Sequence, residues 1–172
     1  MGLIDFVKSA GSALFGKDDE KEIENKARTE APDEAGMAAA REKMRAAKMK
    51  ARLEKSLSDH GLDVDDAAIT IKGDTVQIRG KVDNQSTREK VVLALGNNEG
   101  IGSVDDQLEV TNPEPEATFY TVQRGDTLSK IAKEHYGNAM KYPVIFEANK
   151  PMLSDPDKIY PGQVLRIPPI ED

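Results

Sequence analysis

The sequence contains no cysteine, only two histidines and no hydrophobic run of membrane-spanning length. Without cysteine, disulfides, thiolate metal sites and thiol nucleophiles are excluded. The two histidines, His60 and His135, have no metal-ligand or nucleophile partner at motif spacing. The apolar runs are all shorter than the roughly 20 residues of a spanning helix. We therefore expect a protein without a membrane span and without catalytic residues, that is, not an enzyme.

The charge of the chain is unevenly distributed. Its 172 residues, 38% of them hydrophobic, suit two small domains better than one large core. The formal net charge is -7, and residues 61–111 hold ten acids against five bases, whereas residues 119–172 hold seven of each. An acidic middle domain disfavours nucleic acid and anionic lipid as partners.

Residues 1–16, MGLIDFVKSAGSALFG, have no basic opening and carry two charges inside their apolar stretch. This is not the pattern of a secretory signal, so we expect a cytoplasmic protein. A helical face is predicted for the apolar residues Leu3, Phe6, Val7, Ala10 and Leu14. Such a helix can lie on a membrane or dock on the protein's own core. No cluster of lysine or arginine stands beside it, which favours docking.

Residues 17–48 form a charged insertion. Eight acids lie within residues 18–34, and a mostly basic run covers residues 41–52. The first part is typical of a flexible connector. From Met37 onward the alanine-rich pattern predicts a helix that packs mainly through its second half. The basic run has no interleaved aromatic residues and is interrupted by Glu42, so we interpret it as a solvated helix face rather than a nucleic-acid patch.

Residues 49–111 are predicted to form the first domain. Apolar alternation on both sides of residues 72–75 predicts a β-hairpin. Ser86 and Glu89 have the spacing of a capping box ahead of a helix that stops at Gly96. A strand of period two follows. The expected domain is an antiparallel sheet with two helices on one face.

A linker at residues 112–118 leads to a second predicted domain at residues 119–169. Its order is strand, helix, helix, strand. Asp126 is placed to cap a helix that runs from about Thr127 to Tyr136. A second helix follows and must end before Pro151, and a proline–glycine turn precedes the closing strand.

The second domain resembles LysM domains in three motifs: the GDTL turn, the EAN segment and the PGQVLRIP ending. The segment GIGSVDDQLEV resembles the end of a BON domain. Together with the opening MGLIDFVKSAG, this order is similar to bacterial cytoplasmic potassium-binding proteins of BON–LysM architecture. The resemblance covers about residues 1–15 and 50–168. It implies an α+β fold, with a BON domain followed by a βααβ LysM domain.

The resemblance also implies a site for K⁺. Proteins select this large, weakly polarising ion with neutral carbonyl oxygens rather than with carboxylate clusters. The glycine-rich segment GNNEGI follows a helix end, where unpaired carbonyls and the helix dipole favour a cation. Carried over from the family, the site would use main-chain oxygens of Gly96, Asn98, Gly100 and Ile101 and be closed by Val7 and Ala10. The same segment also fits an ordinary helix cap followed by a loop.

Two functions from different classes remain. The first is a monomeric cytoplasmic potassium sensor or buffer that becomes compact on binding K⁺. The second is an envelope adaptor that binds peptidoglycan or another N-acetylglucosamine glycan through LysM. The groove implied for that glycan is lined by Gly125, Asp126, Thr127, Leu128, Asn149, Pro151 and Met152, although Asp126 and Leu128 also suit a cap and a core. The missing export signal and the single LysM copy favour the first function.

Overall fold

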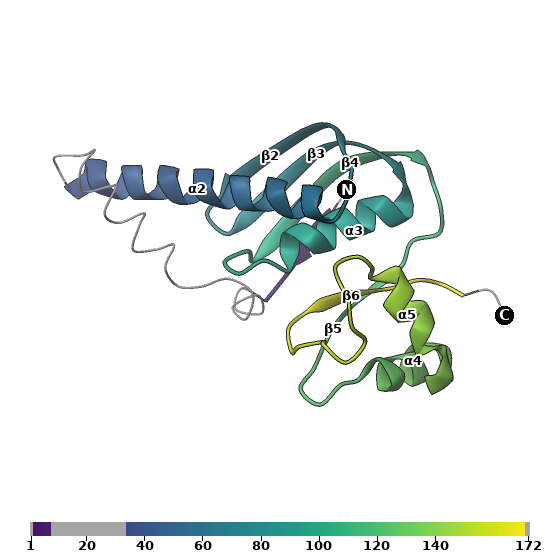
Figure 1. The fold of residues 1–172 in the computed structure, drawn as a ribbon. Coiled ribbons are helices and arrows are strands. Elements are labelled where there is room, and N and C mark those ends of the chain that lie inside the picture. Colours follow the sequence, from purple (N-terminus) through teal and green to yellow (C-terminus); the bar gives the residue numbers. More distant parts are fainter. Residues whose placement is uncertain (1, 8–33, 171–172) are drawn as a thin grey trace.

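The computed structural model describes residues 2–7 and 34–170 of the chain (Figure 1). The described residues form a sheet with two helices packed on one face, followed by a smaller unit of two strands and two helices. The predicted α+β fold class is confirmed.

The first domain contains two helices and four strands. Their bounds are β1 Gly2–Asp5, α2 Glu34–Asp59, β2 Asp65–Lys72, β3 Thr75–Asn84, α3 Gln85–Gly96 and β4 Ser103–Asn112. The sheet order is β1-β4-β3-β2, and β2 and β3 form the predicted hairpin around residues 73–74. Alternate residues of β3 are buried against the helices, as a half-buried strand requires.

The sheet is mixed, so the expectation of a purely antiparallel sheet was wrong. Strands β3 and β4 pair in parallel, from Thr75 opposite Ser103 to Asn84 opposite Asn112. The reason is that α3 connects them as a crossover and returns the chain to the end of the sheet where β3 began. A parallel pair needs such a crossover, whereas a tight hairpin makes an antiparallel one.

The opening residues form a strand, which corrects the helix expected for Leu3, Phe6 and Val7. Strand β1 pairs antiparallel with β4, from Gly2 opposite Asp106 to Asp5 opposite Ser103. Without β1, the backbone of β4 would have a free edge, and pairing satisfies those groups. Ala10 and Leu14, which were assigned to the same helical face, lie outside the described residues.

Helix α2 is 26 residues long, and its N-terminal half extends beyond the sheet (Figure 1). Its buried residues are Leu53 and Leu57, so it packs through its second half, as predicted. It runs without a break through residue 49, where the first domain was expected to begin.

The cap of α3 differs from the predicted capping box. Asn84 is the N-cap, and its side-chain oxygen accepts a hydrogen bond from the Thr87 backbone N–H at 2.8 Å. Ser86 and Glu89 therefore do not form the box. Glu89 is instead buried and paired with Arg166 of the second domain. Asn is as good an N-cap as Ser, and here it also ends the preceding strand.

The second domain has the predicted βααβ order. Its elements are β5 Thr118–Thr121, α4 Leu128–Tyr136, the short 3-10 helix η2 Ala139–Lys141, α5 Tyr142–Ala148 and β6 Val164–Ile167, with β5 and β6 antiparallel. One detail was wrong: Thr127, not Asp126, caps α4 by accepting a hydrogen bond from the Lys130 backbone N–H.

The two domains pack against each other along α3. Val164 of β6 joins the hydrophobic cluster of the first domain, and Phe119 and Met152 pack on the same cluster. At the N-terminal part of α3, Arg166 Nε donates to the buried carboxylate of Glu89. The same carboxylate accepts a hydrogen bond from the Ala117 backbone N–H at 2.9 Å.

A close contact between Phe6 and Gly96 fixes the opening segment on the end of α3. Phe6 is 9% exposed, and a Cβ placed on Gly96 would lie 2.1 Å from Cζ of its ring. Gly96 is helical and does not have a positive φ. Glycine is therefore required at position 96 because a side chain would not fit, and not because of the backbone conformation.

We predict that Gly96→Ala lowers the free energy of unfolding by about 1–3 kcal/mol, the usual cost of overpacking a core. Urea denaturation measures this loss. The control is Gly2→Ala, because a Cβ there meets no atom within 4 Å. When Gly96→Ala is combined with Phe6→Ala, the total loss should be smaller than the sum of the single losses, since the ring is gone. Strictly additive losses would contradict the contact.

Candidate functional site: the turn after α3

The turn at residues 97–102 begins where α3 ends. Asn97 N–H donates to Leu93 O at 3.0 Å, which continues the helical pattern by one residue. The side-chain amide of the buried Asn98 donates to Ala94 O and Leu95 O, at 2.6 and 3.2 Å. The Asn98 side chain therefore donates to two carbonyls at the helix end, and Leu95 O also accepts from the Asn98 backbone N–H at 3.4 Å.

Several carbonyl oxygens at the end of α3 and in the turn accept no hydrogen bond from the residues that the structure describes. Among residues 2–7 and 34–170, no hydrogen bond reaches the carbonyl oxygens of Gly96, Gly100 or Ile101. Asn98 O accepts one, from Ile101 N–H at 3.2 Å, and a carbonyl oxygen has a second lone pair. Of the four residues predicted from the GNNEGI segment, Gly96 is thus the last residue of α3 and the other three lie in the turn, and all four offer neutral oxygens.

The conformation of the turn depends on Gly100. Its φ of +87° is in the left-handed region, which side chains rarely adopt. A Cβ there would also lie 3.3 Å from Cε of Met49 on α2. The next residue, Ile101, is 1% exposed and anchors the turn in the core.

Three neighbouring parts of the protein hold the turn. Phe6 N–H donates to Gly102 O at 2.8 Å, which attaches the opening segment to one side of the turn, and Val7 is the next residue in the chain. Arg52 of α2 donates to Glu99 O at 3.0 Å. Asn97 bonds to the second domain. Ala10, the other residue expected to close the site, lies outside the described residues.

The charged and imidazole side chains described near the turn are not arranged as a cluster of metal ligands. In the described parts of the chain, no three His, Cys, Asp or Glu side chains gather as they do around Ca²⁺ or Zn²⁺. Asp105 and Asp106 follow the turn but are engaged elsewhere. Asp105 accepts from Gln77 at 2.8 Å, and Asp106 accepts from Arg88 at 2.7 Å.

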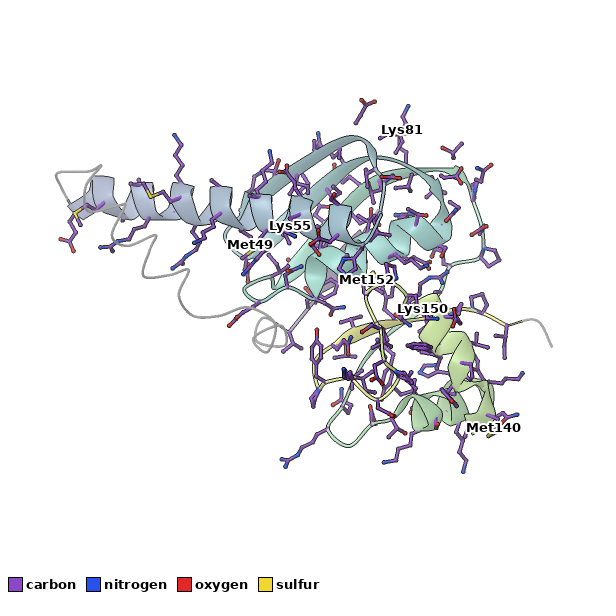
Figure 2. All side chains as sticks on the ribbon, in the orientation of Figure 1. Met49, Lys55, Lys81, Met140, Lys150 and Met152 are labelled. Carbon is purple, nitrogen blue, oxygen red and sulfur yellow. The ribbon has the colours of Figure 1, made fainter. Side chains whose placement is uncertain are left out.

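The residues assigned to a glycan groove already have structural roles. Asp126 accepts hydrogen bonds from Tyr120 Oη and Gln123 N–H, each at 2.8 Å. Leu128 is buried in the core of the second domain. The Asn149 side chain bonds to the backbone of β6. Met152 packs on the first domain and lies beside α3 (Figure 2).

The remaining groove residues, Gly125, Thr127 and Pro151, are exposed. The structure therefore brings the expected lining together only in part. Two side chains that were not among the predicted site residues also hold this region. Phe6 packs on Gly96 at the end of α3, and Asn97 bonds to the second domain. For Phe6 the available signal was an aromatic residue in a short apolar opening, and for Asn97 there was none beyond the loop composition.

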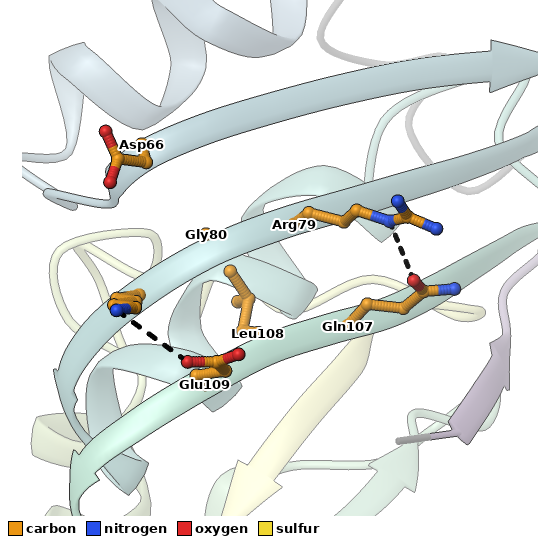
Figure 3. Close-up of a pocket in the computed structure, with 7 residues that line it drawn as sticks. Asp66, Arg79, Gly80, Gln107, Leu108 and Glu109 are labelled. Atoms are coloured by element: carbon orange, nitrogen blue, oxygen red, sulfur yellow. Dashed lines mark hydrogen bonds and ion pairs between the residues drawn. The ribbon is translucent and has the colours of Figure 1, made fainter.

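A separate pocket lies on the outer face of the sheet, away from the helices (Figure 3). Its polar side chains are paired across strands. Arg79 Nε donates to Gln107 at 2.8 Å, and Lys81 lies 4.0 Å from Glu109. Because opposite charges alternate, the surface has no field of one sign, and we interpret it as a solvated sheet face.

Comparisons with known proteins agree with this architecture. A BON domain model matches residues 43–112, and a LysM domain model matches residues 120–168. The chain is 42% identical over 173 residues to potassium binding protein Kbp of Escherichia coli O6:H1, covering 98% of this chain and 99% of Kbp. None of the described helices is long and apolar enough to cross a membrane.

Two partial relatives were also found. An uncharacterized protein of Deinococcus radiodurans is 37% identical over 107 residues, which cover 56% of this chain and 42% of that protein. An esterase of Mycobacterium tuberculosis is 49% identical over 53 residues, only 11% of its own length. Such a small share does not carry an esterase activity, and BON and LysM are non-catalytic families.

The contact between Tyr120 and Asp126 can be tested by titration. The hydrogen bond to the carboxylate, aided by partial burial, raises the pKa of Tyr120 to about 12. Its contribution to stability is therefore full below the unfolded pKa near 10 and is lost as the pH rises to about 12. We expect Asp126→Asn to lower the pKa of Tyr120 toward 10. Phenolate absorbance, with Tyr120→Phe subtracted, measures this, and an unchanged curve would contradict the contact.

Proposed function

The chain belongs to the BON–LysM family that includes potassium binding protein Kbp, and on this premise we propose that it binds K⁺ at the turn after α3. The observation that supports this site is the set of carbonyl oxygens at Gly96, Gly100 and Ile101 without a hydrogen bond from the described residues. Gly96 and Ile101 are buried, whereas Gly100 is exposed, and backbone polar groups in a packed region normally have a partner. A bound cation supplies one.

The proposed ligands are main-chain oxygens. Gly96, Asn98, Gly100 and Ile101 contribute from the turn, and Val7 and Ala10 contribute from the opening segment. All of these groups are neutral, which suits K⁺ better than Mg²⁺ or Ca²⁺, whose sites in proteins normally include carboxylates. The C-terminal end of the α3 dipole adds a favourable field at the same place.

We also propose that the protein acts as a potassium sensor or buffer and becomes more compact when it binds the ion. The turn is held at once by the opening segment, by α2 and by the second domain. An ion that fixes the backbone of the turn stabilises all three contacts together. Ligand binding stabilises the arrangement that binds it better.

A monomer in the cytoplasm is the setting we propose for this activity. Strand β1 is part of the sheet, and Phe6 fills space on Gly96. These opening residues therefore belong to the folded first domain.

The LysM match supports a second candidate, binding of an N-acetylglucosamine glycan. Gly125, Thr127 and Pro151 remain exposed for such a contact. A peptidoglycan pull-down tests it. Retention on peptidoglycan without any heat of potassium binding would place this function ahead of ion binding.

For the first function we predict that calorimetric titration with KCl gives a saturable heat that NaCl and CaCl₂ do not reproduce. KCl should also raise Tm relative to NaCl at equal ionic strength. An unchanged Tm together with no heat would overturn the proposal.

We predict further that Gly100→Val weakens K⁺ binding by at least tenfold, because valine is strained at φ +87° and contacts Met49. The control is Gly137→Val. Gly137 also has a positive φ, +70°, and a Cβ there meets no atom within 4 Å, but it lies at the end of α4. This control should lose stability and keep its K⁺ affinity. Equal loss of affinity in both variants would show that the site is elsewhere.

A further inference from the structure

We propose that Asn97 is the positioning residue that couples ion binding in the turn to docking of the LysM domain on the BON domain. The inference rests on the proposed function and assigns it a mechanism. It concerns the side chain of Asn97, which is not among the proposed ligands.

The side chain of Asn97 bonds to both backbone groups of Val164, the first residue of β6. Asn97 Nδ2 donates to Val164 O at 2.9 Å, and Val164 N–H donates to Asn97 Oδ1 at 3.0 Å. A residue of a neighbouring strand would make the same pair of bonds. The side-chain amide of Asn97 thus makes the hydrogen bonds that one residue of an additional strand beside β6 would make.

The far edge of β6 shows that this pairing is part of the fold. Residues 164 and 166 direct their backbone groups away from β5, because these groups alternate between the two edges of a strand. Asn149 of the LysM domain bonds to both backbone groups of Arg166, each at 2.8 Å. Two asparagine side chains therefore cover the edge, and only Asn97 comes from the other domain.

The Asn97–Val164 pair lies in a closely packed seam. Val164 is 3% exposed, and Leu93, Met152 and Leu153 line the same region. Asn97 itself is only partly buried, but Val164 is buried, so its backbone groups are left without a partner at a cost in free energy when the Asn97 amide is removed. Docking therefore depends on where the turn presents the Asn97 side chain.

Asn97 also stands between two proposed ligands, Gly96 and Asn98. Any change in the backbone of the turn when the ion binds moves the Cα from which the Asn97 side chain extends. Ion binding and docking are then linked, and the linkage is reciprocal, so docking raises K⁺ affinity by the same factor as K⁺ favours docking.

A second attachment provides an internal comparison. Glu89 and Arg166 form a buried ion pair between the same two domains. Glu89 lies eight residues before Asn97 on α3, about 12 Å along the helix axis. This pair holds the LysM domain without touching the turn, so it contributes to docking but not to coupling.

Single-molecule FRET tests the inference. The chain has no cysteine, so Ser58→Cys on α2 and Glu134→Cys on α4, both at exposed positions, give two specific labelling sites. The ratio of docked to undocked molecules is measured in KCl and in NaCl at equal ionic strength. We expect K⁺ to raise this ratio about tenfold, the scale of two net hydrogen bonds.

The variants separate coupling from docking. Asn97→Asp keeps the shape of the side chain but cannot donate to Val164 O. We expect it to give the same docked-to-undocked ratio in both salts. Glu89→Gln should lower the ratio in both salts by a similar factor and keep the tenfold response to K⁺. Asn97→Ala, which introduces no charge, should also give the same docked-to-undocked ratio in both salts. Agreement of the two variants excludes an effect of the aspartate charge.

Two results overturn the inference and differ from failure of the proposed function. Absence of a calorimetric heat with KCl in the unmodified chain overturns potassium binding itself. A normal heat, together with a full K⁺ response in Asn97→Asp, overturns the role of Asn97 alone. A normal heat with no K⁺ response of docking in the unmodified chain also overturns it.

Discussion

The position that the rest of the structure depends on is Gly96, the last residue of α3. Because it has no side chain, the ring of Phe6 lies directly on the helix end. That contact places β1 on the edge of β4 and brings the opening segment to the turn. Because Gly96 lacks a side chain, Phe6 can link the sheet edge, the helix end and the proposed ion site.

The parts of the fold with strong local signals could be predicted from the sequence. The hairpin around residues 73–74 has alternating apolar residues on both sides of a turn, and the second domain has a helix, turn and strand signal at nearly every boundary. Helix α2 already includes residues 34–36, before the expected start at Met37, and its burial at Leu53 and Leu57 was predicted from the apolar spacing.

Features that depend on a distant partner could not be predicted in the same way. Strand β1 is four residues long and exists because β4 offers a free edge. The parallel pairing of β3 and β4 follows from the path of α3, not from either strand's own pattern. Two helix caps were predicted at the wrong residue. Helix α3 is capped by Asn84 rather than Ser86, and α4 by Thr127 rather than Asp126, because several good capping residues stand close together in each sequence.

The candidate site was likewise predictable only in its local part. A glycine-rich segment after a helix indicated where neutral oxygens gather, but a main-chain oxygen has no residue type, so sequence cannot show which ones are already bonded. Asn98 illustrates this. Its side chain donates to the carbonyls of Ala94 and Leu95, while those of Gly96, Gly100 and Ile101 accept no hydrogen bond from the described residues.

The edge of β6 explains why the domain contact can be conditional. A two-stranded sheet has two free edges, and an unpaired edge is a place where other chains bind. Asn149 covers the Arg166 position from within the LysM domain, whatever the other domain does. Val164 is covered only while Asn97 is in place. Because the Glu89–Arg166 pair contributes to docking nearer the other end of α3, the coupling proposed for Asn97 lowers the docked population when its bonds to Val164 are lost but does not abolish docking.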